Sequence, residues 1–370
     1  MPRRLRALLA IAALVIAACA GPTAPTPPAQ PASGAQPVAA APATPPGNAL
    51  APAAAPASAP SAPPDRQAMK YGYSPFFIYG PVFVALERGY FAEQGIDLEL
   101  VPFDSGGLMI PAITSGQLDA CMGVPGPALF NALARGLDLK AFLANNYFDG
   151  YLMASKDLVD RGALQSLDDL RGKRVSFSIE ASAADYALRQ AFYRQGLTLQ
   201  DVEVHRLSIP DTPPALANGA VDVAITAEPM AAALEAQGIA IRWRAMQDLV
   251  GLPLAGFHMA GPSLLARGDE SVIHFATAVV KGLRDYDASI QNNKIVDPAV
   301  REILNKWTNI PSDSIALASM IPGPPSGRLD LDDLDRQQEF WLREGLQSQR
   351  ADLSKLVESK YLDAAVAKLR

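Results

Sequence analysis

The chain has 370 residues and a formal net charge of −6, from 32 basic and 38 acidic residues, and it contains two cysteines. Mixed charge of this kind excludes the strongly basic surface that nucleic-acid binding requires. The length is sufficient for a body with two modest hydrophobic cores.

The first residues predict a signal peptide at 1–18. Arg3, Arg4 and Arg6 precede an apolar run from Ala7 to Ala18, which is shorter than a membrane-spanning helix needs. The run ends in small residues before Cys19, a pattern that resembles the bacterial lipobox, in which the chain is cleaved before a cysteine that then carries lipid. An ordinary signal peptide with an incidental cysteine is the alternative. We therefore expect a lipid anchor at Cys19 on the extracytoplasmic face of the cell membrane, with no other membrane attachment.

Residues 19–66 predict a disordered tether. Between Gly21 and Pro64 the chain is dominated by Ala and Pro and has no charged or aromatic residue. Such a segment cannot bury enough apolar surface to offset the entropy of ordering, and its prolines favour an extended spacer. If Cys19 is lipidated, Cys121 has no partner for a disulfide within the chain, and its apolar neighbours predict a small buried residue.

The elements of the body alternate between strands and helices. Ile96 to Val101 shows clean period-two alternation, and the helix that opens at Pro81 ends at Gly89. In the first half we expect strands at 70–73, 96–101, 118–122 and 139–144, with helices at 81–88, 104–114 and 125–136. In the second half we expect strands at 173–178, 202–207 and 221–225, with helices at 181–195 and 213–218.

This alternation predicts an α/β fold with parallel strands in two lobes. We assign 67–153 plus 258–370 to lobe 1, the latter as a helical remainder that packs back on the first unit, and 154–257 to lobe 2. The segments near 151–156 and 254–258 are expected to cross between the lobes as a hinge.

Four segments in chain order carry a family resemblance: VALERGYFAEQGIDLELVPFDSGG, AITSGQLDACMG, SLDDLRGKRVSFS and LANGAVDVAITAEP. They resemble the type II periplasmic-binding proteins, in the branch that serves nitrate, taurine, sulfonate, riboflavin and thiamine-precursor importers. The resemblance implies a two-lobed fold with a ligand cleft between the lobes. It also implies a monomeric binding lipoprotein that delivers a small molecule to an ABC permease and its ATPase, without cofactor, metal or catalytic residues. A sensing role needs the same cleft and is the alternative.

The loops at the carboxyl ends of the strands are the expected ligand contacts, because ligands of such sheets bind there. The candidate residues are Phe76, Phe77, Tyr79, Ser105, Gly106, Asn145, Tyr147, Tyr151, Ser178, Glu180, Ser182, Asp211, Thr212, Glu228 and His258. Ser182 and Glu180 could equally serve as helix caps, Glu228 as a surface acid, and His258 as a buried structural residue.

The same loops contain no Arg or Lys, although an oxyanion is usually held by an arginine fork. Their aromatic rings suit a flat ligand, and their amides, hydroxyls and acids suit its polar edge. The sequence therefore favours a planar heteroaromatic ligand, riboflavin first and the thiamine pyrimidine precursor next. An alkanesulfonate, taurine or nitrate is the alternative ligand.

An enzyme is the alternative class of protein. The branch includes enzymes that build the thiamine pyrimidine, whose activity goes with a cysteine-rich motif, and the body here has only Cys121. His205, His258 and His274 are scattered along the chain, which does not favour a metal site.

Overall fold

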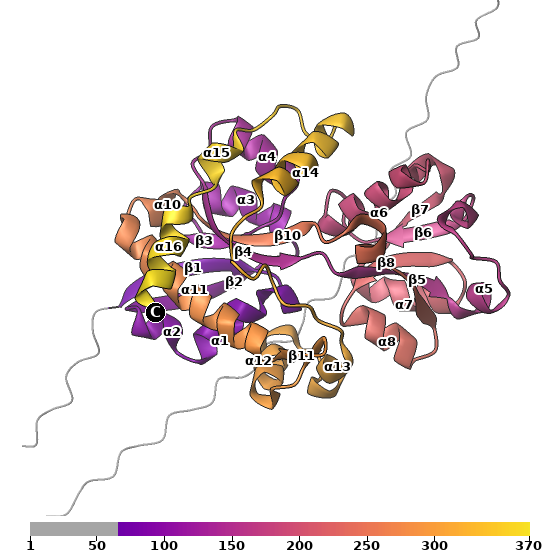
Figure 1. Ribbon diagram of the computed structural model, residues 1–370, viewed down its shortest axis with the longest axis horizontal. Coiled ribbons are helices and arrows are strands. Elements are labelled where there is room, and N and C mark those ends of the chain that lie inside the picture. The colour runs from indigo at the N-terminus through magenta and orange to yellow at the C-terminus, as the bar shows by residue number, and fades with distance from the viewer. Residues whose placement is uncertain (1–65) are drawn as a thin grey trace, which may run out of the picture. The chain divides into compact units, whose positions relative to one another are not determined.

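The computed structural model describes residues 66–370. The predicted signal peptide, Cys19 and nearly all of the predicted tether lie outside the described residues. These residues form two halves, each built around a five-stranded sheet, and the two sheets lie toward the left and the right of the view in Figure 1.

The first sheet has the order β2-β1-β3-β10-β4. Its strands are β1 (Gln67–Tyr73), β2 (Ile96–Pro102), β3 (Ala120–Gly123), β4 (Lys140–Tyr147) and β10 (Leu254–Ala260). β1, β2 and β3 are parallel, whereas β10 runs antiparallel to both of its neighbours. The alternation predicted for β2 is confirmed, because Ile96 and Leu98 are buried while Asp97 and Glu99 face solvent.

The second sheet has the order β7-β6-β8-β5-β9. Its strands are β5 (Gly150–Ser155), β6 (Arg174–Phe177), β7 (Glu203–Arg206), β8 (Val223–Ala227) and β9 (Ala240–Ala245). β6, β7 and β8 are parallel, and β5 is antiparallel to β8 and β9. The two sheets therefore share one plan: three parallel strands followed by an inserted antiparallel strand and an outer strand.

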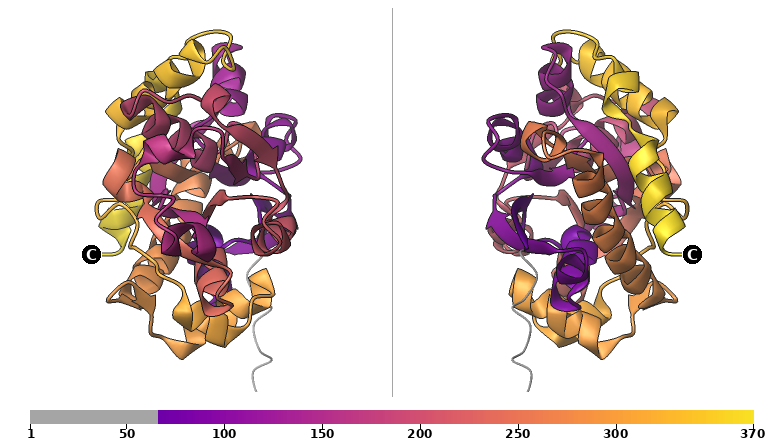
Figure 2. Two further views of the ribbon diagram at one scale, coloured as in Figure 1. Left: turned by 90° about the vertical axis from the view of Figure 1, so that its right-hand side faces the viewer. Right: turned by 90° about the vertical axis from the view of Figure 1, so that its left-hand side faces the viewer.

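Helices cover both sheets. They are α1 (Gly80–Glu87), α2 (Tyr90–Glu93), α3 (Gly106–Thr114), α4 (Pro127–Ala134), α5 (Lys156–Asp160), α6 (Ala183–Arg194), α7 (Thr212–Ala217), α8 (Met230–Ala236), α9 (Met246–Val250), α10 (Pro262–Leu265), α11 (Asp269–Ala288), α12 (Pro298–Thr308), α13 (Ser312–Leu317), α14 (Leu331–Arg343), α15 (Leu353–Leu356) and α16 (Ser359–Lys368). A short hairpin, β11 (Ile290–Gln291) with β12 (Lys294–Ile295), follows α11. Figures 1 and 2 show α11 and α16 side by side against the first sheet, and both helices contact β4.

The crossings between the halves differ from the sequence prediction. The predicted hinge segments at 151–156 and 254–258 lie largely inside β5 and β10, and each is bonded into a sheet. The chain crosses instead at 148–149, between β4 and β5, and at 251–253, before β10. The alternating pattern did not identify either strand, since β5 follows β4 directly and β10 follows α9, a helix that the sequence did not predict. The second sheet consequently begins at Gly150 rather than at 154, and β10 returns the chain to the first sheet at Leu254.

One local device connects helix to strand in each half. Gly116 and Gly219 end a helix with φ of +78° and +74°, a backbone conformation that glycine adopts without strain. Three residues later, Asp119 accepts a hydrogen bond from the Lys70 N–H at 2.8 Å, and Asp222 accepts one from the Arg174 N–H at 2.8 Å. Each carboxylate thus fixes the backbone of a neighbouring strand, at Lys70 within β1 and at Arg174, the first residue of β6.

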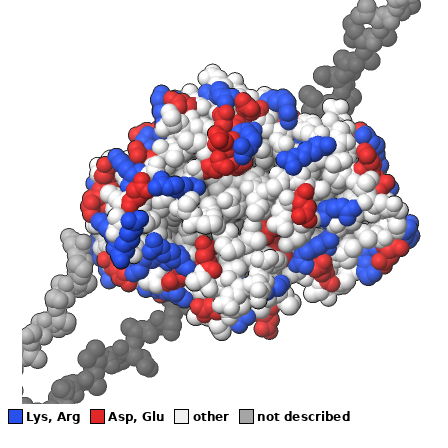
Figure 3. Space-filling model, in the orientation of Figure 1, with Lys and Arg blue, Asp and Glu red and all other residues white. Residues whose placement is uncertain are grey.

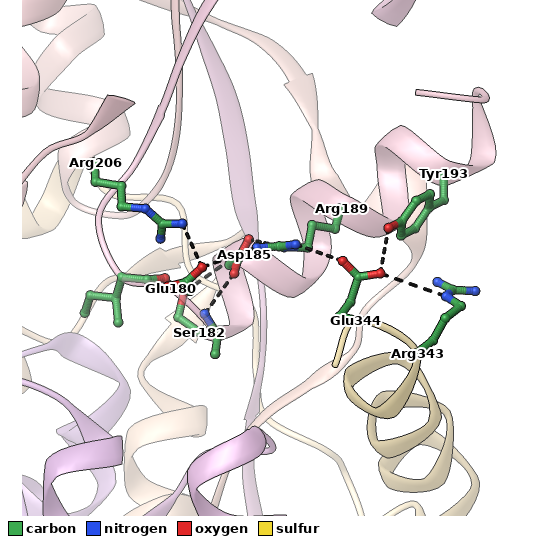
Figure 4. A network of polar contacts seen from close by, with 10 residues as sticks. Glu180, Ser182, Asp185, Arg189, Tyr193, Arg206, Arg343 and Glu344 are labelled. Carbon is green, nitrogen blue, oxygen red and sulfur yellow. Dashed lines mark hydrogen bonds and ion pairs between the residues drawn. The ribbon is translucent and has the colours of Figure 1, made fainter. Parts of the chain in front are cut away.

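A clasp outside the crossings also joins the halves. Arg189 of α6 donates to Glu344, at the end of α14, at 2.8 Å and to Asp185 at 2.7 Å, and Tyr193 donates to Glu344 at 2.6 Å (Figure 4). Beside this network, the Tyr186 ring meets the Phe340 ring edge-on at a centroid distance of 5.0 Å. Because Phe340 packs in the first core, the clasp fixes α6 against the first half.

The surface shows no separation of charge by sign on the face in Figure 3. Acidic and basic side chains are interspersed there, with an uncharged stretch between the two halves. On this face neither sign of charge forms a continuous patch.

Replacing Asp222 with Asn tests the strand-fixing device. Burial raises the pKa of Asp222, but the side-chain and backbone N–H groups of Arg174 lower it by more, so the pKa lies below its ordinary value. A lowered pKa stabilises the fold above the unfolded-state pKa, and that stabilisation is lost as the pH falls through the folded-state value. We expect Asp222→Asn to lower the free energy of unfolding by about 1–3 kcal/mol at pH 7, and by less near pH 3, in urea titrations. Asp157→Asn, in an exposed pair with Arg161, is the control; an equal loss in both variants would contradict the role of Asp222.

Replacing Arg189 with Met tests the clasp. The side chains of Arg189, Asp185 and Glu344 are 13%, 0% and 11% exposed, so the change leaves two carboxylates poorly compensated. We expect a loss of about 3–5 kcal/mol in urea denaturation. Arg161→Met removes a pair whose side chains are 61% and 71% exposed, and it should cost less than about 1 kcal/mol. Similar losses in the two variants would show that the clasp does not hold the halves.

Candidate functional site

A cavity of about 910 Å³ lies between the two sheets, at the carboxyl ends of their strands. The first half contributes the segments after β1, β2, β3 and β4. The second half contributes the segments after β6, β7 and β8. The topology therefore places the site where parallel strands end in both halves, as expected from the sequence.

The wall of this cavity is mainly apolar and aromatic. Phe76 and Tyr147 are half-buried and expose part of their rings to the cavity. Phe77 and Tyr79 also touch it, but their exposed fractions are only 2% and 1%, so most of each ring belongs to the core. Tyr286, near the end of α11, adds a further ring. Flat ligands can stack on such surfaces.

A buried hydrogen-bond relay holds the aromatic segment in place. The Tyr71 hydroxyl donates to Nδ1 of His258 at 2.8 Å, and Nε2 of His258 donates to Oδ1 of Asn145 at 2.9 Å. Nδ2 of Asn145 in turn donates to the Ile78 carbonyl at 2.7 Å. Burial lowers the pKa of His258 to about 3, so the ring is neutral and can accept at one nitrogen and donate at the other. The relay joins β1, β10 and β4 to the loop that carries Phe76.

The loops of the two halves approach closely at the rim. A Cβ at Gly126, before α4, would lie 2.9 Å from the Ala181 carbonyl oxygen, before α6. Ser182 caps α6, because its hydroxyl accepts from the Asp185 N–H at 3.3 Å and donates to the Ile179 carbonyl at 2.7 Å. Its side chain therefore serves the helix, while Ser105 caps nothing with its side chain.

Four carboxyl groups lie on the cavity wall, and in residues 66–370 no Lys or Arg lines it. Two of the four have guanidinium partners: Glu180 accepts from Arg206 at 2.7 Å, and Glu228 accepts from Arg242 at 2.5 Å. The other two are Asp149, in the first crossing, and Asp287, in the last turn of α11. Burial raises the pKa of each of these two to about 6.

Most of the predicted contacts line the cavity, but three do not. Those on the wall are Phe76, Phe77, Tyr79, Ser105, Gly106, Asn145, Tyr147, Ser178, Glu180, Ser182, Thr212 and Glu228. The structure places Tyr151 inside β5 beneath Arg242, whose guanidinium lies 5.0 Å from the ring centroid. Asp211 is exposed and accepts from Ser208, while His258 is fully buried in the relay. These three expectations of cleft contact are corrected.

The candidate residues do not include several parts of the wall. Ser74 and Asp149 line it but were not chosen, although the strand pattern did identify their loops. Tyr286, Asp287 and wall residues between 308 and 323 belong to the helical remainder, which the pattern did not connect with the cavity. No strand end precedes the latter residues, so the rule that located the other loops could not find them.

A second cavity, of about 710 Å³, lies at the amino ends of β1 and β2. Four of its five charged side chains are paired, Lys70 with Glu99 at 3.2 Å and Asp119 with Arg267 at 2.9 Å, and the fifth, Asp97, is exposed to solvent. It lies at the opposite edge of the first sheet from the strand ends that bind ligands in such folds.

The described part of the chain offers neither a metal-binding cluster nor a membrane-spanning helix. Residues 66–370 contain no group of three or more His, Cys, Asp or Glu side chains placed to hold a metal ion. None of the helices in this range is both long and apolar enough to cross a membrane. Cys121 is buried, as predicted from its neighbours, and burial raises the pKa of its thiol.

Comparison with known proteins adds a family and a fold. The family model described as NMT1/THI5 like matches residues 78–288. The riboflavin-binding protein RibY of Chloroflexus aurantiacus is 27% identical over 217 residues, which cover 58% of this chain and 60% of that protein. The chain thus spans less than two thirds of this curated relative.

Solved structures with low identity share the fold. The periplasmic nitrate-binding protein NrtA from Synechocystis is 13% identical, with a TM-score of 0.67 over 83% of this chain and 90% of that one. The alkanesulfonate-binding protein SsuA from Xanthomonas axonopodis, bound to MOPS, is 20% identical, with a TM-score of 0.62 over 80% and 99%. The desulfurization enzyme DSZB is 18% identical, with a TM-score of 0.57 over 82% and 100%.

The two-lobed fold expected from the resemblance is confirmed by these likenesses. Because a single family model matches more than half of the chain, the protein belongs to the NMT1/THI5 like family.

Proposed function

We propose that the protein is the extracytoplasmic binding component of an ABC importer. In this role it captures a small molecule in the cavity between the halves and delivers it, as a monomer, to a membrane permease driven by a separate ATPase. The family, the fold and the position of the cavity support this function. A lipid at Cys19 and the residues of the predicted tether would hold it at the membrane surface.

The ligand we propose is a planar heteroaromatic molecule, with riboflavin as the first candidate and the thiamine pyrimidine precursor as the second. One observation carries this choice: the cavity combines half-buried rings with polar edges and, within the described residues, has no cationic side chain on its wall. RibY, a relative that binds riboflavin by name, supports the first candidate.

An alkanesulfonate, taurine or nitrate is the alternative ligand. SsuA and NrtA share the fold, but at an identity that carries no statement about the ligand. An oxyanion would need donors, and the guanidinium groups of Arg206 and Arg242 are already bonded to Glu180 and Glu228.

An enzyme is the alternative class, since DSZB shares the fold. Cys121 is a poor nucleophile, because it is fully buried and burial raises the pKa of its thiol. Turnover of a pyrimidine or sulfinate substrate by the purified protein would revive this alternative.

Quenching of riboflavin fluorescence by the purified protein tests the proposed ligand. We expect saturable quenching, and we expect Phe76→Ala and Tyr147→Ala each to weaken binding by about 1–3 kcal/mol, roughly five- to hundredfold, through lost stacking. Phe103→Ala is the control, because Phe103 is a half-buried ring on the second cavity.

Calorimetric titration with nitrate, taurine and an alkanesulfonate completes the test. Tight binding of one of these anions, with no binding of a flavin or a pyrimidine, would overturn the planar-ligand proposal. Loss of binding in Phe103→Ala as large as in Phe76→Ala would place the effect on the fold rather than on the site.

A further inference from the structure

The four carboxyl groups on the cavity wall form two pairs with different surroundings. Glu180 and Glu228 each have an arginine at hydrogen-bond distance, so their charge is balanced within the protein. Neither Asp149 nor Asp287 has an ion pair among residues 66–370. The wall therefore carries two acids whose charge no residue of the described part of the chain balances.

Asp149 lies in the first crossing, between Phe148 and Gly150. In the described part of the chain its carboxyl group makes no hydrogen bond. Burial is the first cause that raises the pKa of Asp149, and the negative charge of Glu228, which follows β8, is the second. Arg242 of β9 lowers this pKa, but its guanidinium group is bonded to Glu228 and Glu235. The arginine is therefore already committed to other carboxylates.

Asp287 lines the same cavity, in the last turn of α11. The only hydrogen bond that its carboxyl group accepts from residues 66–370 comes from the Gly323 N–H, at the long distance of 3.4 Å. Burial is the main cause that raises its pKa, and this N–H lowers it. Tyr286, beside it in sequence, is buried in the wall and keeps its hydroxyl proton.

An unpaired carboxylate against an apolar wall is unfavourable, because desolvation is not offset by an opposite charge. A neutral side chain at the same position would cost the folded state less free energy. Two such groups on one ligand-sized cavity are explained if the missing partner is supplied by the ligand.

We propose that the ligand is a flat, positively charged nitrogen heterocycle and that Asp149 and Asp287 determine this specificity. The inference rests on the proposed function of binding a flat heteroaromatic ligand and revises the order of the candidates, because it ranks cationic rings above neutral flavins such as riboflavin. The rings on the wall would hold the flat faces, and the two carboxylates would balance the charge and accept N–H groups at the edge.

A charge series on one ring system tests the inference. The probes are 10-methylacridinium, a fixed cation, neutral acridine, and acridine-9-carboxylate, an anion, titrated by fluorescence at pH 7.5 in chloride-free buffer. We expect the cation to bind about tenfold or more tightly than acridine, and the anion to bind most weakly. Asp149→Asn and Asp287→Asn should each cut the affinity for the cation about tenfold and change that for acridine by less than about twofold. Asp248→Asn is the control, because Asp248 is exposed and lies off the cavity wall.

The pH dependence gives a second readout with the fixed cation. Both carboxyl groups have a pKa of about 6, so they are mostly protonated at pH 5 and mostly ionised at pH 7.5. We expect the affinity for 10-methylacridinium to rise across this range, and we expect the rise to be smaller in each Asn variant.

Thermal stability of the ligand-free protein gives a third readout. A raised carboxyl pKa means that ionisation destabilises the folded state as the pH rises. Asp149→Asn and Asp287→Asn should therefore raise Tm relative to the parent protein by more at pH 7.5 than at pH 4.5. A lower Tm of these variants at pH 7.5 would show that the carboxylates are structural and would overturn the inference.

The possible outcomes also distinguish failure of the charge-specificity proposal from failure of the flat-ligand proposal on which it rests. Equal binding of all three probes would leave the flat-ligand proposal standing and overturn the charge specificity alone. Binding of none of the probes would overturn the flat-ligand proposal, and the inference would fall with it. Preference for the anion would favour the oxyanion alternative and overturn both.

Discussion

The buried relay from Tyr71 through His258 and Asn145 to the Ile78 carbonyl is the constraint on which the site depends. It ties three strands of the first sheet, β1, β10 and β4, to the loop that follows β1. A buried polar group without a partner is costly, so each member needs the next one in its observed position. The rings of that loop reach the cavity because the hydrogen bond from Asn145 to the Ile78 carbonyl holds the backbone of the loop in place.

The connection between the halves depends on the same part of the sheet. β10 carries His258, and at its start both backbone groups of Leu254 are bonded by α14: the N–H donates to Asp333 at 2.8 Å, and the carbonyl accepts from Gln337 at 2.9 Å. The other end of α14 reaches α6 through Glu344 and Arg189. One C-terminal helix therefore contacts both a crossing strand and the second half, which limits the motions by which the cavity can open.

Much of the fold and part of the site could be predicted from the sequence. Alternating apolar residues in β2, and glycines at the helix ends before β3 and β8, identified the parallel strands and hence the loops at their carboxyl ends. β5 and β10 could not be found this way, because an antiparallel insertion is specified by its neighbours in space and not by a local period. For the same reason Tyr151 and His258 are expected in the cleft, although Tyr151 lies half-buried in β5 under Arg242 and His258 lies in the buried relay.

The sequence by itself determined the α/β class, the repeated unit, the family resemblance and the scarcity of cations in the candidate loops, because each of these depends on local pattern or composition. Tertiary structure alone decided which carboxylates are balanced. Glu180 and Glu228 look like Asp149 and Asp287 in the chain, yet Arg206 and Arg242 reach only the first two. Pairing of charges requires residues distant in sequence to meet within a few ångströms, and only the folded chain specifies which of them do so.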